Sequence, residues 1–498
     1  MTSVDELALA GEFPAATREQ WQELVLAVLR RSGGDVPDDV DEALGTRTYD
    51  GVLIRPLYTA DDAAHAVGGA GSATAAQAGV VPGGRGAGPW DVRQRHADPD
   101  PVAAAAAAVA DLEHGVTSLW VVARPGELRQ RLDGVLLDLA GVALGVAGGV
   151  PGSSSAGARG SGGAASPSSA DVAGRGPAGS AGSRVGAECG AAVALAGEFL
   201  EVLGERGIGA VPSGSLGLDP IGGQADDGAL DAVVELARRC EAGHPGLRAI
   251  TVDGLRYHEA GGSAAQEVAC TVAAGVEYLR VLTAAGMDVA AAAGQLEFRY
   301  AATADQFLTI ATLRAARRVW HRVTEVCGAP ARQVQHVVTS PAMQTRRDPW
   351  VNLLRSTIAC FAGGVAGADA ITVLPFDHAI GRPDAFARRI ARNTHALLVE
   401  ESHVARVADP AAGSWYVDTL TEELAAKTWE LFRRIESTGG MRGALRDGTV
   451  AAELAATWAA RRADVAHRRA PITGVSEFPD LTERPVTRPP WPGAGAAT

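Results

Sequence analysis

Short β-rich runs alternate with longer stretches of helical periodicity through most of this 498-residue chain, and no other feature constrains its fold as strongly. The alternation is typical of repeated βα units, whose successive strands pair in parallel. The candidate strands are Ser118–Ala123, Val135–Leu139, Gly209–Ser213, Ala249–Asp253, Gln295–Tyr300, Gln335–Thr339, Ala370–Leu374 and Ala405–Val407. This number of strands predicts an α/β fold with a closed (β/α)8 TIM-type barrel, and an open doubly wound sheet is the alternative.

Helices are expected between these strands, and the clearest cover Ala304–Val326, Asn352–Val365 and Ala385–Val399. A barrel of this kind carries its reactive groups at the carboxyl ends of its strands. Functional side chains should therefore be sought at that end.

The chain divides by composition into four parts. Residues 1–63 form an N-terminal extension with one helix, and residues 64–88 form a low-complexity linker. The barrel is expected over 89–440, and it is interrupted at about 148–186 by an insert of Gly, Ala, Ser and Pro that buries too little apolar area to order its backbone. Residues 441–498 are expected to form a last helix, Val450–Arg462, and an irregular tail.

The helix of the N-terminal extension, expected over Thr17–Arg31, carries one apolar stripe. The stripe is formed by Trp21, Leu24, Val25, Val28 and Leu29. These positions recur at helical spacing, so the helix needs an apolar surface to cover. That surface is either the chain's own barrel or a second subunit.

Charge and composition exclude several classes of partner. A formal charge of −13 and a pI near 5.4 repel a polyphosphate backbone, so nucleic acid is not an expected partner. The five cysteines are scattered without the spacing of a metal site or a disulfide framework, and no metal ligands are expected. We find no secretory signal and no membrane-spanning run, so we expect a cytoplasmic protein that does not interact with membranes.

Several separated segments resemble one protein family. They are the stretch from Arg392 to Asp418, Trp90-Asp-Val-Arg-Gln94, Glu259-Ala-Gly261, Leu313-Arg-Ala-Ala-Arg317 and Arg389-Ile-Ala-Arg-Asn-Thr394. Together they are similar to the acyl-CoA mutases typified by methylmalonyl-CoA mutase. The resemblance implies a barrel whose axis is a tunnel for the pantetheine arm of CoA, capped by adenosylcobalamin on a separate carboxyl-terminal domain.

The resemblance also implies two side chains for radical chemistry, and this chain lacks both. Arg95 stands where the family has a tyrosine, and Arg256 stands where it has a histidine. A guanidinium group can replace neither a planar phenol nor a proton donor near neutral pH. His258 lies two residues further on, and in a strand it would share a face with Arg256, so it is a weak substitute unless it is structural. We therefore expect no catalytic residues.

Six side chains could form a vestigial substrate site. The candidates are Arg93, Gln94, Arg256, His258, Gln295 and Arg299. Arg93 and Gln94 could hold a carboxylate, or they could make structural hydrogen bonds. The motif Asp-x-His-x-x-Gly, with which the family's cobalamin domain binds cobalt, is not found in the sequence. This chain alone is therefore expected to bind no cofactor.

The leading hypothesis is the small, non-catalytic subunit of a heterodimeric mutase. Its large partner would bind acyl-CoA and adenosylcobalamin and would isomerise methylmalonyl-CoA to succinyl-CoA, while the isolated small chain would be inactive. One alternative is a catalytic barrel that uses a separately encoded cobalamin-binding protein. Another is a degenerate barrel that acts only as a scaffold.

Overall fold

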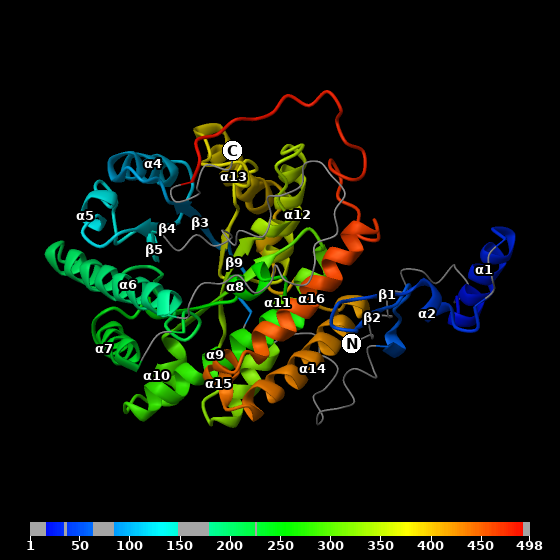
Figure 1. The fold of residues 1–498 in the computed structure, drawn as a ribbon, viewed down its shortest axis with the longest axis horizontal. Helices are drawn as coiled ribbons and strands as arrows, with labels where there is room; N and C mark the ends of the chain where they lie inside the picture. Colours follow the sequence, from blue (N-terminus) through cyan, green and yellow to red (C-terminus); the bar gives the residue numbers. More distant parts are fainter. Residues whose placement is uncertain (1–15, 34–36, 63–83, 148–178, 225–226, 492–498) are drawn as a thin grey trace, which may run out of the picture.

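Eight parallel strands close into a barrel in the computed structural model, which describes residues 16–33, 37–62, 84–147, 179–224 and 227–491 (Figure 1). The strands are β3 (Asp91–His96), β4 (Ser118–Ala123), β5 (Gly141–Val146), β6 (Gly214–Leu218), β7 (Leu247–Asp253), β8 (Leu296–Ala302), β9 (Val334–Thr339) and β10 (Ala370–Thr372). Neighbours along the chain are neighbours in the barrel, and β10 closes it by pairing with β3. The predicted (β/α)8 fold is confirmed, and the open sheet is excluded.

Helices surround the barrel and extend it at both ends of the chain. Those between the strands are α4 (Pro101–Glu113), α5 (Leu128–Arg131), α6 (Gly179–Glu205), α7 (Asp227–Gly243), α8 (Leu255–Glu259), α9 (Ala264–Ala284), α10 (Val289–Gly294), α11 (Gln306–Val326) and α12 (Val351–Val365). After β10 come α13 (Ala385–Ala396), α14 (Trp415–Ser437), α15 (Gly440–Arg446) and α16 (Thr449–Ala466). The extension before the barrel contains α1 (Arg18–Arg31), α2 (Val40–Leu44), β1 (Thr46–Arg47) and β2 (Leu53–Ile54).

Polar caps fix where several of these helices begin. Thr17 and Ser263 each form a reciprocal capping box with a glutamine three residues later, at the start of α1 and α9. Asp100, followed by a proline in the first turn, caps α4, and Asp384 caps α13. The sequence predictions for α11, α12 and α16 agree with the structure to within a few residues.

Three predicted strands are wrong. Val135–Leu139 and Gly209–Ser213 precede the true strands β5 and β6, and the segment predicted at Ala405–Val407 forms part of a 3-10 turn, Val404–Arg406. The eighth strand is instead β3, within the motif Trp90-Asp-Val-Arg-Gln94. Because β5 and β6 each contain two glycines, they lack the β-branched composition by which a strand is usually recognised.

The glycines in β5 and β6 are required by close packing between strands. A Cβ atom on Gly214 would lie 2.2 Å from the carbonyl oxygen of Val142 on the adjacent strand. Gly217 has a φ of +74° at the irregularity where β6 shifts its register against β7, and a Cβ there would lie 2.3 Å from the carbonyl oxygen of Leu144. Only glycine fits these positions, so sequence propensity misses the strands.

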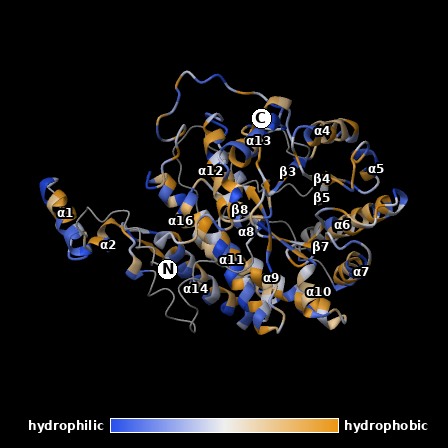
Figure 2. Cartoon of the chain, turned by 180° about the vertical axis from the view of Figure 1, so that it is seen from behind, coloured by the Kyte–Doolittle hydropathy of each residue, from blue (hydrophilic) through white to orange (hydrophobic). Residues whose placement is uncertain are grey.

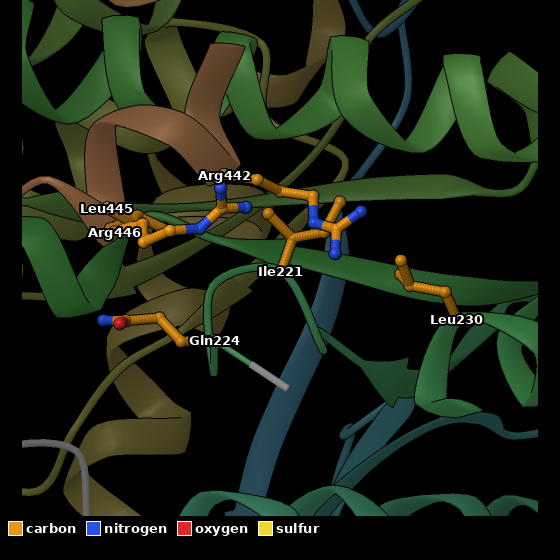
Figure 3. A pocket seen from close by; sticks show the side chains of 6 residues that line it. All are labelled: Ile221, Gln224, Leu230, Arg442, Leu445 and Arg446. Carbon is orange, nitrogen blue, oxygen red and sulfur yellow. The ribbon is translucent and has the colours of Figure 1, made fainter. Parts of the chain in front are cut away.

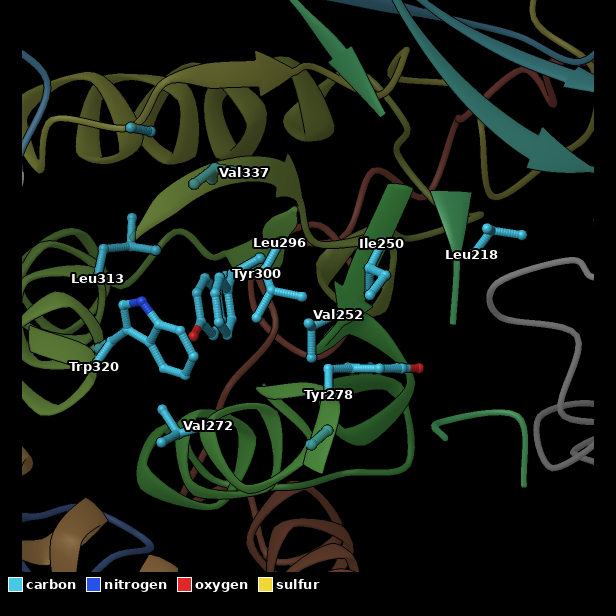
Figure 4. Close-up of a cluster of buried hydrophobic side chains, with 14 of the residues drawn as sticks. Leu218, Ile250, Val252, Val272, Tyr278, Leu296, Tyr300, Leu313, Trp320 and Val337 are labelled. Carbon is cyan, nitrogen blue, oxygen red and sulfur yellow. The ribbon is translucent and has the colours of Figure 1, made fainter. Parts of the chain in front are cut away.

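The apolar core lies between the barrel wall and its helices. Figure 4 shows its part around β7, β8, α9 and α11, where Tyr300 and Trp320 lie among aliphatic side chains from these elements. The ring of Phe298 packs 4.7 Å from that of Trp320, centroid to centroid. Helices α9, α11 and α14 pack against one another on this side, which gives the barrel a rigid outer layer.

The helix α1 stands away from the barrel (Figure 1). None of its residues is buried, and Leu24 and Val28 are 69% and 60% exposed. Arg18 ties it to its own extension through ion pairs with Asp41 and Asp62. The alternative that its stripe packs on the chain's own barrel is therefore wrong.

The two predicted low-complexity segments fall mainly outside the described residues, which exclude 63–83 and 148–178. Residues 179–186, placed in the second insert by the sequence, are helical and begin α6. At the end of the first segment, Gly88 donates a backbone hydrogen bond to Ala405. Arg85 donates to the carbonyl of Ala368, so the end of this segment runs along the barrel.

The tail that follows α16 folds back over the carboxyl-terminal mouth of the barrel. Arg347, after β9, forms an ion pair with Glu483 of the tail. Further along, Arg488 pairs with Asp377 in the loop after β10, and Trp491 donates from Nε1 to the carbonyl of His378 at 3.1 Å. The irregular tail predicted from its prolines is thus an ordered strap over residues 471–491.

We predict that Gly364→Ala destabilises the barrel by about 1–3 kcal/mol, because overpacking a tight interior forces neighbouring groups to shift. Its added methyl would lie 2.6 Å from the ring of Trp90, which is 1% exposed. Gly197→Ala in α6 is the matched control, since a Cβ there meets no atom within 4 Å, and it should stabilise the chain slightly. Urea denaturation of both variants measures the difference, and equal midpoints would contradict the packing argument.

Candidate functional site

The structure distributes the predicted site residues over three levels of the barrel. Arg95 on β3, Arg299 on β8 and Arg256 on α8 lie at the carboxyl-terminal end, where they line one cavity. Arg93 lies lower in the interior. Gln295 caps α10 at the amino-terminal end of β8 and accepts a hydrogen bond from the backbone of Ala249.

Gln94 is not part of the interior. Side chains alternate along a strand, so Gln94 shares the outer face of β3 with Val92 and His96, whereas Arg93 and Arg95 face inward. His96 lies 3.5 Å from Asp111 of α4, as expected for a side chain that points toward the helices. The pair of Arg93 and Gln94 therefore does not converge on one ligand.

The Arg93 guanidinium forms an ion pair across the barrel. Its Nη1 lies 2.9 Å from Oε2 of Glu297 on β8, and its Nε donates to Ser118. Three strand steps separate β3 from β8 by the shorter way round, so this contact spans the interior. Both side chains are at most 3% exposed, and the carboxylate held by Arg93 belongs to the chain itself.

A second cross-barrel contact lies one layer closer to the carboxyl ends. The Arg299 guanidinium stacks over the ring of Trp120 at 4.3 Å, from a strand four steps away. Trp120 also packs edge-on against His336, with ring centroids 5.5 Å apart. Since Arg299 and Trp120 come from opposite walls, their side chains fill the barrel axis.

His336 joins these groups as a neutral imidazole. Burial, reinforced by the charges of Arg93 and Arg299, holds the pKa of His336 well below its usual value. Its Nδ1 accepts from Nε of Arg299 at 3.1 Å, so the proton is assigned to Nε2, which donates to Thr372 at 2.8 Å. The histidine is fully hydrogen-bonded and positions Arg299.

Arg95, at the position of the family's tyrosine, lies between two indole rings. Its guanidinium is 5.3 Å from the Trp120 centroid and 5.4 Å from that of Trp491 in the tail. Burial, and then the charge of Arg299, lower the pKa of Arg95 to about 10, so it remains a cation at neutral pH. The tail thus contributes a side chain to this end of the barrel.

Arg256, at the position of the family's histidine, is held by a carboxylate. Its Nη2 lies 2.9 Å from Oδ2 of Asp219. Tyr278 donates to the other oxygen of Asp219 at 2.7 Å. Burial alone would lower the pKa of Arg256, but the charge of Asp219 raises it. This guanidinium therefore neither donates nor accepts a proton in neutral solution.

His258 is a structural residue and not a neighbour of Arg256 on a common strand face. Both residues lie in the short helix α8, where two positions correspond to opposite sides, so the period-two argument is wrong. The Nε2 atom of His258 is 2.7 Å from Oγ of Ser340, and Nδ1 is 3.5 Å from Glu267. Both ring nitrogens have partners, which leaves none for a substrate.

Two cavities open at opposite ends of the barrel, and they share no lining residue. The amino-terminal one has a volume of about 620 Å³ and includes Arg93 and Glu297 in its wall. The carboxyl-terminal one measures about 180 Å³ and includes Arg95, Trp120 and Arg299. The two cross-barrel contacts lie between them, so the axis is not a continuous tunnel.

A third cavity, of about 190 Å³, lies outside the barrel. Ile221 and Gln224 from the connection after β6 line it together with Arg442 and Arg446 of α15 (Figure 3). Arg442 already pairs with Asp227. This hollow separates α15 from the β6–α7 connection and brings together none of the predicted site residues.

Within the described residues, no three His, Cys, Asp or Glu side chains gather closely enough to hold a metal ion. None of the described helices combines the length and apolar character needed to cross a bilayer.

Sequence reasoning missed Glu297, His336, Trp120, Asp219 and Trp491. A signal was available for Glu297. It stands two residues before Arg299 in an otherwise apolar strand, so the two charged side chains face the same side. Asp219 directly follows β6, as functional groups do in these barrels. No local pattern indicates Trp491, because its contacts come from a distant segment.

Comparison with known proteins gives consistent results. The family profile described as methylmalonyl-CoA mutase matches residues 225–490. The methylmalonyl-CoA mutase small subunit of Streptomyces virginiae is 52% identical over 98% of this chain and 75% of its own length. The corresponding small subunit of Propionibacterium freudenreichii subsp. shermanii is 37% identical over 98% of this chain and 73% of its own length.

Replacing Glu297 by Gln should destabilise the chain by about 3–5 kcal/mol, because it leaves the buried Arg93 cation without its counter-charge. The double variant Arg93→Met, Glu297→Leu removes both charges and should recover most of that loss. Urea denaturation measures both. Glu42→Gln is the control, since its partner Arg47 is 56% exposed and an exposed pair contributes about 0–1 kcal/mol.

Acid should destabilise the native chain through its buried histidines. Burial lowers the pKa of His395 to about 3, and its Nδ1 accepts from Trp90. The unfolded chain binds that proton near pH 6.5 and the native chain does not, so stability is full above pH 6.5 and falls toward pH 3.

His395→Gln should therefore reduce the slope of unfolding free energy against pH by up to about 1.4 kcal/mol per pH unit in that window. The exposed His467→Gln is the matched control. Urea midpoints between pH 7 and pH 4 measure the slope, and an unchanged slope in the His395 variant would disprove the assignment.

Proposed function

The chain belongs to the methylmalonyl-CoA mutase family, and we propose that it acts as a small, non-catalytic subunit that stabilises a larger catalytic partner. The interrupted barrel axis carries this proposal. In the family the pantetheine arm of CoA threads the axis, whereas here Arg93 with Glu297 and Arg299 with Trp120 occupy it. Acyl-CoA is therefore assigned to the partner.

The positions of the family's radical chemistry support the same role. Arg95 is enclosed by Trp120 and Trp491, and Arg256 is paired with Asp219. Neither guanidinium can act as an acid near neutral pH. His258, the weak substitute, already has both nitrogens engaged. A catalytic barrel that borrows a separate cobalamin protein would still lack these groups.

Adenosylcobalamin is likewise assigned to the partner. The family places this cofactor over the carboxyl-terminal mouth, where it supplies the radical, and here the tail covers that mouth. Arg488 pairs with Asp377, and Trp491 lies against Arg95 and His378. A flat macrocycle would have to displace these contacts, so the described residues at this mouth do not fit the cofactor.

We infer that α1 is part of the surface that binds the partner. Among the described residues, none of its apolar side chains belongs to the hydrophobic core, and Leu24 and Val28 are mostly exposed. Figure 2 shows the helix carrying hydrophobic and hydrophilic residues at the edge of the molecule. An amphipathic helix that leaves its apolar stripe uncovered is suited to docking on a second protein.

Mixing the purified chain with the large catalytic subunit of a mutase from this family tests the proposal. We expect a 1:1 complex on size-exclusion chromatography and no mutase activity from the chain with adenosylcobalamin alone. Turnover by this chain with a stand-alone cobalamin protein would establish the catalytic alternative. Failure to associate with either component would favour the scaffold.

Leu24→Glu combined with Val28→Glu should weaken the complex by about tenfold or more, because charges replace apolar groups that a partner would bury. Leu139→Glu is the matched control, since Leu139 is 70% exposed and lies in the connection between α5 and β5, away from α1. Titration of labelled variants against the large subunit measures the affinities. Equal affinities for the two variants would exclude α1 from the interface.

A further inference from the structure

The carboxyl-terminal cavity is lined by more hydrogen-bond donors than the chain satisfies. Trp120 Nε1, Arg256 Nε and Arg299 Nη2 are buried, and none of them has a hydrogen-bond partner among the described residues. These donors come from three separate elements around one cavity of about 180 Å³. A buried polar group without a partner costs about 1–3 kcal/mol, so three around one cavity call for an explanation.

The acceptors in the same wall are already used. Asp219 accepts from Tyr278 and from the backbone of Gly222, and it pairs with Arg256. Asp253 pairs with Arg299 and accepts from the backbone of Leu255. Within the described residues, the buried part of the wall therefore has donors without acceptors, because the further carboxylate of the lining, Glu188, is exposed, and a ligand that fits the buried part must bring its own acceptors.

The charges of the cavity wall also favour a ligand that carries hydrogen-bond acceptors. Three guanidinium groups, from Arg95, Arg256 and Arg299, line the cavity together with the half-buried carboxylates of Asp219 and Asp253, and the exposed carboxylate of Glu188 lies at its edge. Asp219 and Asp253 each pair with one arginine, and Arg95 forms no ion pair within the described residues. Glu259 lies close enough to act on Arg95, but burial, followed by the charge of Asp253, raises the pKa of Glu259 to about 8. At neutral pH Glu259 is mostly uncharged, so no buried carboxylate among the described residues neutralises Arg95.

The remaining wall is apolar and small. Val122, Leu144, Val146 and Ala192 line the cavity, and Gly145 lies beside Trp120, where an added Cβ would come within 2.9 Å of Nε1. A volume of about 180 Å³ accommodates roughly six water molecules. That space suits a compact anion with a short apolar part and is too small for a coenzyme.

We propose that this cavity is a binding site for a small carboxylate, whose oxygens accept from the donors of its wall and whose short carbon chain packs on the apolar side. The donors are those of Arg95, Arg256, Arg299 and Trp120. A planar carboxylate matches the fork of a guanidinium group. The site would be formed by arginines at the two positions where the family has its tyrosine and histidine. It goes beyond the proposed subunit role and does not depend on it.

Titration of the purified full chain with sodium propionate, followed by calorimetry, tests the site. A ligand of this size should bind with a dissociation constant on the order of 0.1–1 mM. Arg95→Met should weaken binding about tenfold or more, because it removes a charged hydrogen-bond donor. Arg322→Met, on the exposed side of α11, is the matched control and should bind as the parent chain does.

Gly145→Ala provides a second variant that keeps every charge but places a methyl group against Trp120, and it should also weaken propionate binding. Circular dichroism checks that each variant is folded. No saturable binding of propionate, or equal binding by the Arg95 and Arg322 variants, would overturn the proposal. Inorganic phosphate is titrated in parallel, and binding of phosphate without propionate would overturn the assignment to a carboxylate. None of these outcomes depends on whether the large subunit binds.

Discussion

The ion pair between Arg93 and Glu297 is the contact on which the rest of the barrel interior depends. Two charges at most 3% exposed are tolerable only because each neutralises the other across the barrel. The next layer of the interior is also filled by the chain's own side chains. There Arg299 stacks on Trp120 and donates a hydrogen bond to the neutral His336. This barrel thus fills its own axis with polar and aromatic side chains.

The carboxyl-terminal mouth of the barrel is likewise covered by side chains of the same chain. A strap that begins after α16 returns over the loops that follow β9 and β10, and Trp491 completes a stack with Arg95 and Trp120. The interior is therefore filled by side chains of the barrel strands, and the mouth is covered by the carboxyl-terminal tail. Between them lies a small cavity with buried donors that have no hydrogen-bond partner among the described residues.

The fold could be predicted from the sequence because the βα alternation is repeated, so errors in single strands do not change the topology. The strands β5 and β6 were misplaced because contacts between neighbouring backbones, and not β propensity, select their glycines. Arg95, Arg256 and Arg299 were found through motifs and do converge. Gln94 and Gln295 do not join them, since strand alternation and strand end decide which way a side chain faces. Trp491 could not be predicted, because no sequence pattern around residue 491 indicates a contact with the distant strand β3.

The uncovered helix α1 has a consequence for how this protein must be made. A chain synthesised without its partner exposes Leu24 and Val28 on the projecting arm that α1 forms. Exposed apolar side chains of this kind promote self-association at high concentration. On the proposed role of α1 in binding the partner, balanced synthesis of the two subunits would shield the arm as soon as it forms. We therefore expect recombinant yields to depend less on the stability of the barrel than on whether the companion chain is translated in the same cell.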